Sequence, residues 1–131
     1  SDGGVQYSIR GGGARPPITA AALAAMFNAG EYDTDLTKRM REYCKRTIWP
    51  DKSIASSPGH WHYMHFYFSQ VVYRTGGDEW TKYRDELNRK LVQEMQSGGG
   101  WADPQVGTVY VTSLNCIMLQ LDKGFLPIYQ R

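Results

Sequence analysis

Residues 80–110, WTKYRDELNRKLVQEMQSGGGWADPQVGTVY, divide into a charged segment, a glycine-rich turn and a nearly uncharged segment. The apolar side chains of the first segment recur at the spacing of one helix face: Trp80, Tyr83, Leu87, Leu91 and Met95. Charged side chains fill the opposite face, and oppositely charged residues four positions apart stabilise a helix by roughly 0.2–0.5 kcal/mol per pair. The stretch therefore predicts an outer amphipathic helix, a turn and an inner helix.

Similar patterns along the chain predict an all-α fold. Helices are expected near residues 18–29, 35–47, 61–75, 79–96 and 109–121, in antiparallel pairs and with no sheet. The third of these segments carries no Asp, Glu, Lys or Arg before Arg74 and is apolar all the way round. A helix that is apolar on every side must be buried on every side, so this segment is predicted to be an inner helix.

Short polar residues mark two of the helix starts. Any of Asp33, Thr34 and Asp35 can cap the second helix, because a side-chain oxygen there accepts a hydrogen bond from a free backbone N–H. Asp78 follows the glycine pair that ends the third helix, and it is expected to cap the fourth.

The chain opens and closes on similar segments. Residues 3–7 and 98–101 are both glycine-rich and end on an aromatic residue. Each is followed eleven or twelve residues later by a threonine that opens an apolar helix, Thr19 in the first case and Thr112 in the second. This spacing predicts an internal repeat about 93 residues apart, as in an array of similar helical units.

The turn after the fourth helix resembles the QW repeat of squalene cyclases and related prenyltransferase-type proteins. Val92, Gln96, Gly99 and Trp101 stand in register with its pattern, and Leu91 stands where the pattern has an aromatic residue. In that motif the Gln side chain bonds free backbone groups of the next helix start, and the Trp ring covers the turn. Trp101 is therefore expected to be largely buried.

The resemblance extends over most of the chain, except for residues 49–59. The motifs occur in this order: Gly-Gly-x-x-Tyr, Thr-Ala-Ala, Tyr-x-x-Gly-Gly-Asp-Glu-Trp, the QW-like turn, Val-Tyr-x-Thr-Ser and Leu-Pro-x-Tyr-Gln-Arg. The chain is similar to the C-terminal part of bacterial prenyltransferase/squalene-oxidase-repeat proteins. This resemblance implies one helical domain over residues 1–131, forming part of an (α/α) toroid of the terpenoid cyclase and protein prenyltransferase kind. Because the first residue is Ser1, a fragment of a longer protein is expected.

Charge and composition exclude several classes of partner. A formal net charge of +2 is too small to indicate a nucleic acid, and the basic run at residues 38–46 is interpreted as a solvated helix face. No hydrophobic run is long enough to span a membrane. Cys44 and Cys116 give neither a disulfide framework nor a Cys-x-x-Cys metal spacing, and buried thiols are the favoured interpretation.

The acid motif that the resemblance requires of a cyclase, Asp-x-Asp-Asp, does not occur in the chain. The nearest sequence, residues 33–35, lies where a helix cap is expected. The Asp-Asp-x-x-Asp pattern that binds diphosphate through magnesium is also absent, and Cys116 lacks the Asp that would precede it in the zinc site of protein prenyltransferases. No catalytic residue and no cofactor are therefore predicted.

All three histidines of the chain lie close together, at His60, His62 and His65. This spacing makes a His-x-His-x-x-His metal site conceivable, because imidazole is a common zinc ligand. No carboxylate or cysteine stands nearby to complete such a site, so hydrogen-bonded packing residues are the favoured interpretation and no metal is predicted. The residues predicted to bind a ligand are Trp61, His62, Tyr63, His65 and Phe66.

Two functions from different classes follow. The first is a non-catalytic binding or scaffold module, in which aromatic inner helices bind an apolar small molecule or a protein partner. The alternative is part of a terpene cyclase or prenyltransferase-type enzyme whose catalytic motif lies outside this chain. In either case five helices are too few to close a toroid, so uncovered apolar faces are expected to bind a ligand or to form a twofold homodimer.

Overall fold

The computed structural model of the chain describes residues 2–52 and 58–125. Its five helices and one short 3-10 turn are α1 (Pro16–Asn28), α2 (Asp35–Ile48), α3 (Pro58–Thr75), α4 (Gly77–Glu94), α5 (Thr108–Leu119) and η1 (Leu121–Lys123). Within the described ranges the only β-type pairing is an isolated bridge between Gln6 and Ala14. The predicted all-α fold is confirmed. None of the described helices has both the length and the apolarity that crossing a bilayer requires.

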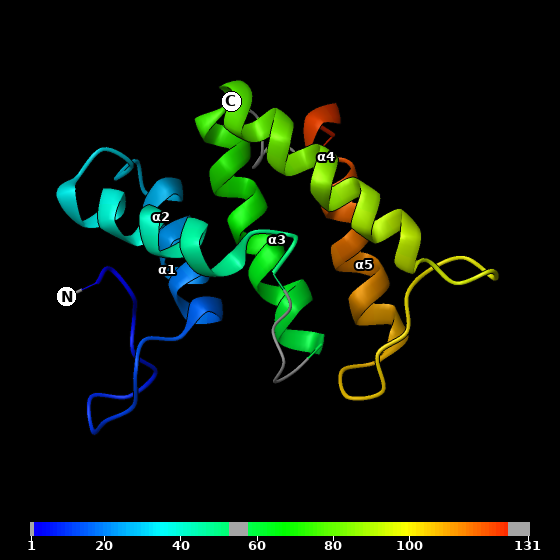
Figure 1. Cartoon of the computed structure of the whole chain (residues 1–131), viewed down its shortest axis with the longest axis horizontal. Coiled ribbons are helices and arrows are strands. Elements are labelled where there is room, and N and C mark those ends of the chain that lie inside the picture. Colours follow the sequence, from blue (N-terminus) through cyan, green and yellow to red (C-terminus); the bar gives the residue numbers. More distant parts are fainter. Residues whose placement is uncertain (1, 53–57, 126–131) are drawn as a thin grey trace.

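The helices form two layers, with α3 at the centre. Figure 1 shows α1, α3 and α5 running in the same direction, while α2 crosses in front of α1 and α4 crosses in front of α5. α3 contacts each of the other four helices. Its central position explains its composition, because a helix with neighbours on several sides buries most of its circumference.

The burial of α3 is nevertheless incomplete. Met64, Phe68 and Val71 are fully buried in the core, as the sequence predicts. Phe66 and Tyr67 are only partly buried, so the expectation that this helix is buried on every side is wrong. The other helices pack around α3 without enclosing the face that carries these two side chains.

The helix ends follow the predicted caps in one case and differ in another. Thr34 caps α2, since its hydroxyl accepts a hydrogen bond from the Thr37 backbone N–H at 3.2 Å. Asp78 does not cap α4: the cap is Gly76, whose φ of +73° an L-residue rarely adopts, and Asp78 lies in the first turn. A carboxylate in that turn still interacts favourably with the positive end of the helix dipole.

In the QW-like turn, the prediction that Trp101 is buried is confirmed, whereas the predicted role of the Gln96 side chain is wrong. Trp101 is 5% exposed, and its indole N–H donates to the Leu91 carbonyl at 2.8 Å, near the end of α4. Because α4 ends at Glu94, Gln96 lies beyond the helix with an exposed side chain. The main chain of Gln96 closes the turn instead, with its N–H bonded to the Gly100 carbonyl at 3.1 Å.

A threonine ties the segment before α1 to that helix, and another does the same for α5. The Thr19 hydroxyl accepts from the Val5 N–H at 2.9 Å and donates to the Arg15 carbonyl at 2.8 Å. The Thr112 hydroxyl accepts from the Trp101 N–H at 3.0 Å and donates to the Trp101 carbonyl at 3.3 Å. The two contacts differ in spacing, because the donor lies 14 residues before Thr19 and 11 residues before Thr112, and the internal repeat stays a prediction.

Candidate functional site

The five residues predicted to bind a ligand differ in how deeply α3 buries them. Trp61, His62 and His65 are buried, with exposed fractions of 6%, 7% and 0%. Tyr63 and Phe66 are only partly buried. The structure therefore does not bring the five side chains together into one site.

Three partly exposed side chains of α3 and one exposed side chain of α5 lie near one another. We call these four residues the aromatic face: Tyr63, Phe66 and Tyr67 of α3 and Tyr110 of α5. The Tyr63 and Tyr67 rings are edge-to-face with centroids 4.9 Å apart, and the Phe66 and Tyr67 rings are 5.0 Å apart in the same geometry. Burial, together with the neighbouring Tyr67 and Tyr110 phenols, raises the pKa of Tyr63. Burial and the nearby Tyr67 phenol also raise the pKa of Tyr110. Tyr63 and Tyr110 are therefore neutral at physiological pH, which suits an apolar ligand.

Sequence reasoning missed two members of this face. Tyr67 could have been found, because it follows Tyr63 by four positions and so lies on the same side of a helix. Tyr110 could not, because it comes from α5 and only the packing of α5 against α3 places it near the other phenols.

The histidines are held apart by hydrogen bonds to two different helices. His62 Nδ1 is 2.8 Å from Asn115 Oδ1 of α5, whereas His65 Nδ1 is 2.7 Å from the Tyr83 hydroxyl of α4. His60 is exposed. In the part of the chain that the structure describes, no group of three His, Cys, Asp or Glu side chains could hold a metal ion. The two buried histidines thus act as hydrogen-bonded packing residues.

One carboxylate of the residues 33–35 and one of the two thiols have roles other than catalysis. Asp33, next to the Thr34 cap, forms an ion pair with Lys38 at 2.9 Å. Burial raises the pKa of the Cys44 thiol to about 12, so this side chain is protonated and unreactive at neutral pH. These groups give no support to the enzyme alternative.

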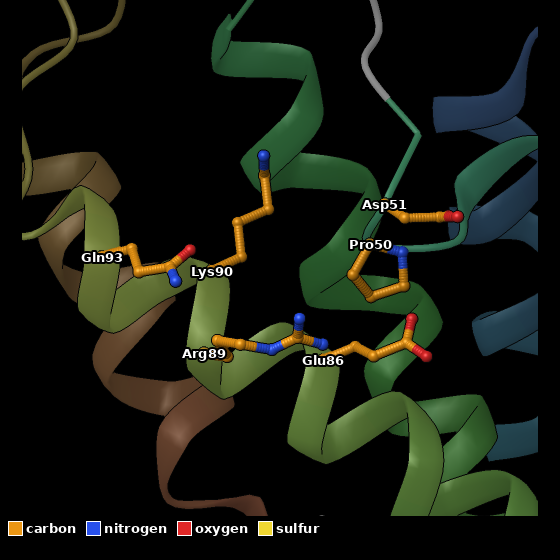
Figure 2. A pocket seen from close by; sticks show the side chains of 6 residues that line it. All are labelled: Pro50, Asp51, Glu86, Arg89, Lys90 and Gln93. Atoms are coloured by element: carbon orange, nitrogen blue, oxygen red, sulfur yellow. The ribbon is translucent and has the colours of Figure 1, made fainter.

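A small pocket lies between the loop after α2 and the exposed side of α4. Figure 2 shows its lining, in which Pro50 and Asp51 face side chains of α4, and its volume is about 190 Å³. The α4 residues are Glu86, Arg89, Lys90 and Gln93. The Trp49 indole N–H donates to Glu86 Oε2 at 2.6 Å and so ties the loop to the helix. The sequence indicates only a loop here, because the pocket exists only where that loop meets α4.

The lining of this pocket carries two carboxylates and two cations, so it has no strong preference for ligands of either charge. Lys90 is engaged with Glu94 at 3.0 Å, and one oxygen of Glu86 is occupied by Trp49. None of the aromatic-face residues lines it. The aromatic face is therefore the stronger candidate for an apolar ligand.

Comparison of the chain with protein families, with curated proteins and with solved structures finds no match. The resemblance to prenyltransferase and squalene-cyclase-like repeats accordingly rests on the sequence motifs and remains a prediction.

Proposed function

We propose that this chain is a helical-repeat binding module whose aromatic face takes an apolar, isoprenoid-like ligand. The module is part of an (α/α) toroid of the prenyltransferase and squalene-cyclase-like kind, and its role is binding or scaffolding. The observation that carries the proposal is the aromatic face itself, where side chains of α3 and α5 lie near one another without being fully buried.

The chemistry of that face supports an apolar ligand. Aromatic side chains offer a large apolar area with few rotatable bonds, so they lose little conformational entropy when a ligand binds. The edge-to-face contacts of Tyr67 with Tyr63 and Phe66 hold the rings in place before any ligand arrives. The phenol groups at the rim can bond a single polar end group, such as an alcohol.

The arrangement of the helices supports the repeat architecture. α1, α3 and α5 lie in one layer and α2 and α4 in the other, as alternating inner and outer helices of a repeat array would. A threonine hydroxyl also accepts from a backbone N–H of the preceding segment in both α1 and α5, although the spacing of the two contacts differs.

The proposal is tested by titrating the protein with farnesol, an isoprenoid alcohol, in an isothermal calorimeter. Tyr67→Ala removes the ring at the centre of the aromatic face. We expect affinity to fall at least tenfold, which corresponds to about 1.4 kcal/mol. Tyr32→Ala is the matched control, because Tyr32 is 64% exposed and lies outside the aromatic face. It is expected to leave affinity unchanged.

Absence of farnesol binding, or an equal loss in both variants, would contradict the proposal. Light scattering at several concentrations identifies the case in which a second copy of the chain covers the aromatic face. If the protein is a dimer and Tyr67→Ala makes it monomeric, the aromatic face binds a second copy of the chain and not a small ligand.

A further inference from the structure

Two imidazoles join α3 to the helices that follow it. His62 bonds Asn115 of α5, and His65, three residues later, bonds Tyr83 of α4. The Trp61 ring packs between these contacts, with its centroid 5.0 Å from that of His62 and 4.1 Å from that of His65. We call these five side chains the histidine junction.

The histidine junction contains polar atoms that the protein leaves unpaired. Trp61 Nε1, His65 Nε2 and Asn115 Nδ2 are buried without a hydrogen-bond partner among the residues that the structure describes. A buried polar atom without a partner is destabilising, because it has lost its hydrogen bonds to water and gained none in the protein. The contact of α3 with α4 and α5 is therefore weaker here than its apolar area alone would make it.

The surroundings of the junction shift the pKa values of the two histidines to different extents. Burial lowers the pKa of His62, while the Asn115 hydrogen bond and the carboxylates of Glu94 and Asp103 oppose that change and Lys90 adds to it. Burial lowers the pKa of His65 much further, and both His62 and Lys90 disfavour its charged form.

The Tyr83 phenol that faces His65 carries no charge to offset a proton, because burial, with a contribution from Cys44, raises its own pKa. Of the two histidines of the junction, His65 is thus the one that the folded protein accepts less readily in its charged form.

The contact of α3 with α1 contrasts with this junction. α1 has the sequence PPITAAALAAMFN and contains no ionisable side chain. The only histidines of the chain are those at the start of α3. A change of pH between 5 and 7 therefore acts on the contacts of α3 with α4 and α5, while the α1 contact contributes no titrating group from α1.

We propose that the histidine junction is an acid-sensitive contact: uptake of protons by His65 and His62 between about pH 7 and pH 5 releases α4 and α5 from α3 while α1 stays packed on α3. The sign follows from linkage. A neutral, buried histidine contributes stability that is fully present above its ordinary value of about 6.5 and is lost as the pH falls below it. For one histidine that stays neutral until the contact opens, the opening equilibrium constant rises about 30-fold at pH 5.

Amide hydrogen exchange at about pH 7.5 and about pH 5, corrected for the intrinsic pH dependence of exchange, tests the proposal. We expect the opening constant of the α4 and α5 amides to rise by at least tenfold on acidification, and that of the α1 amides to stay within about twofold. An equal rise in all five helices would show global unfolding and overturn the proposal, as would no rise in α4 and α5.

Variants identify the responsible side chains. In His65→Asn and His62→Asn the amide takes the place of Nδ1 as hydrogen-bonding group but does not titrate. The double variant is expected to lose the acid response, and His60→Asn, at an exposed position, is expected to keep it. Should the double variant not fold, the ring resonances of His62 and His65 in the wild-type protein decide the matter. Rings that become protonated while the amides of α4 and α5 stay protected would overturn the proposal.

Discussion

The segment before α1 and the segment before α5 begin in the same way and are covered differently. Each contains a glycine pair, and in each a residue after that pair donates its backbone N–H to a threonine hydroxyl of the following helix. Before α1 this residue is the partly buried Val5, and before α5 it is the buried Trp101. The backbone hydrogen bond to a threonine is common to both segments, but the side chain of the donor residue differs.

The covering helix explains the difference. A Cβ atom added to Gly3 would lie 2.2 Å from the Arg39 carbonyl oxygen of α2, so the main chain passes directly against that helix. A Cβ atom added to Gly99 would have no heavy atom within 4 Å in the described structure. The first turn is thus covered by a helix, whereas the second is open at Gly99 and its Trp101 ring packs against the end of α4. Close packing is therefore not a property of the glycine pair, since it depends on which helix lies over the turn.

The largest expected effect is that of removing the ring that covers the second turn. Trp101→Ala should lower the free energy of unfolding by roughly 3–5 kcal/mol, as for other large buried side chains, and it also removes the bond to Leu91. Val5→Ala, the corresponding change before α1, should lower it by about 1 kcal/mol, because that side chain is smaller and only partly buried. Urea unfolding measures both, and a loss below about 1 kcal/mol for Trp101→Ala would contradict the QW-like assignment.

Substitution of the glycines should lower stability more before α1 than before α5, which is the opposite of the order expected for Trp101 and Val5. Gly3→Ala is expected to lower the free energy of unfolding by roughly 2–4 kcal/mol, because the new methyl group meets a backbone oxygen that cannot move aside. Gly99→Ala should lower it by only about 1 kcal/mol, which is the conformational penalty of an L-residue at a φ of +81°. Equal thermal shifts for the two variants would show that α2 does not cover the first turn as closely as described.

The smallest expected difference concerns the two threonines. Thr19→Val leaves the Val5 N–H without its partner next to a fully buried side chain, at an expected loss of roughly 1–3 kcal/mol. Thr112→Val should give about 1 kcal/mol or less, because Thr112 is partly exposed and water can replace the hydroxyl. Chemical unfolding of both variants checks the order, and a larger loss for Thr112→Val would remove the distinction between a covered and an open turn.

The sequence predicted the helices well because their signals are local. The apolar spacing of α4 and the polar cap at Thr34 depend on neighbours a few positions away, so they can be recognised without knowing the fold. The predicted helix 79–96 ends at Gln96, two residues later than α4, because the chain leaves the helix before it reaches the glycine run. The expected role of the Gln96 side chain was wrong for the same reason.

The sequence by itself determined an all-α chain with one unusually apolar helix, α3, and a buried Trp101 at the last turn, because periodicity and composition act over short distances. Only the tertiary structure decided which of the predicted site residues on α3 the neighbouring helices bury. His62 meets Asn115 and Tyr63 lies near Tyr110 because α5 packs beside α3, and contacts between residues about 50 positions apart leave no mark in the local pattern. The burial of a side chain and its hydrogen-bond partners depend on how the helices pack. These two properties distinguish the histidine junction from the aromatic face.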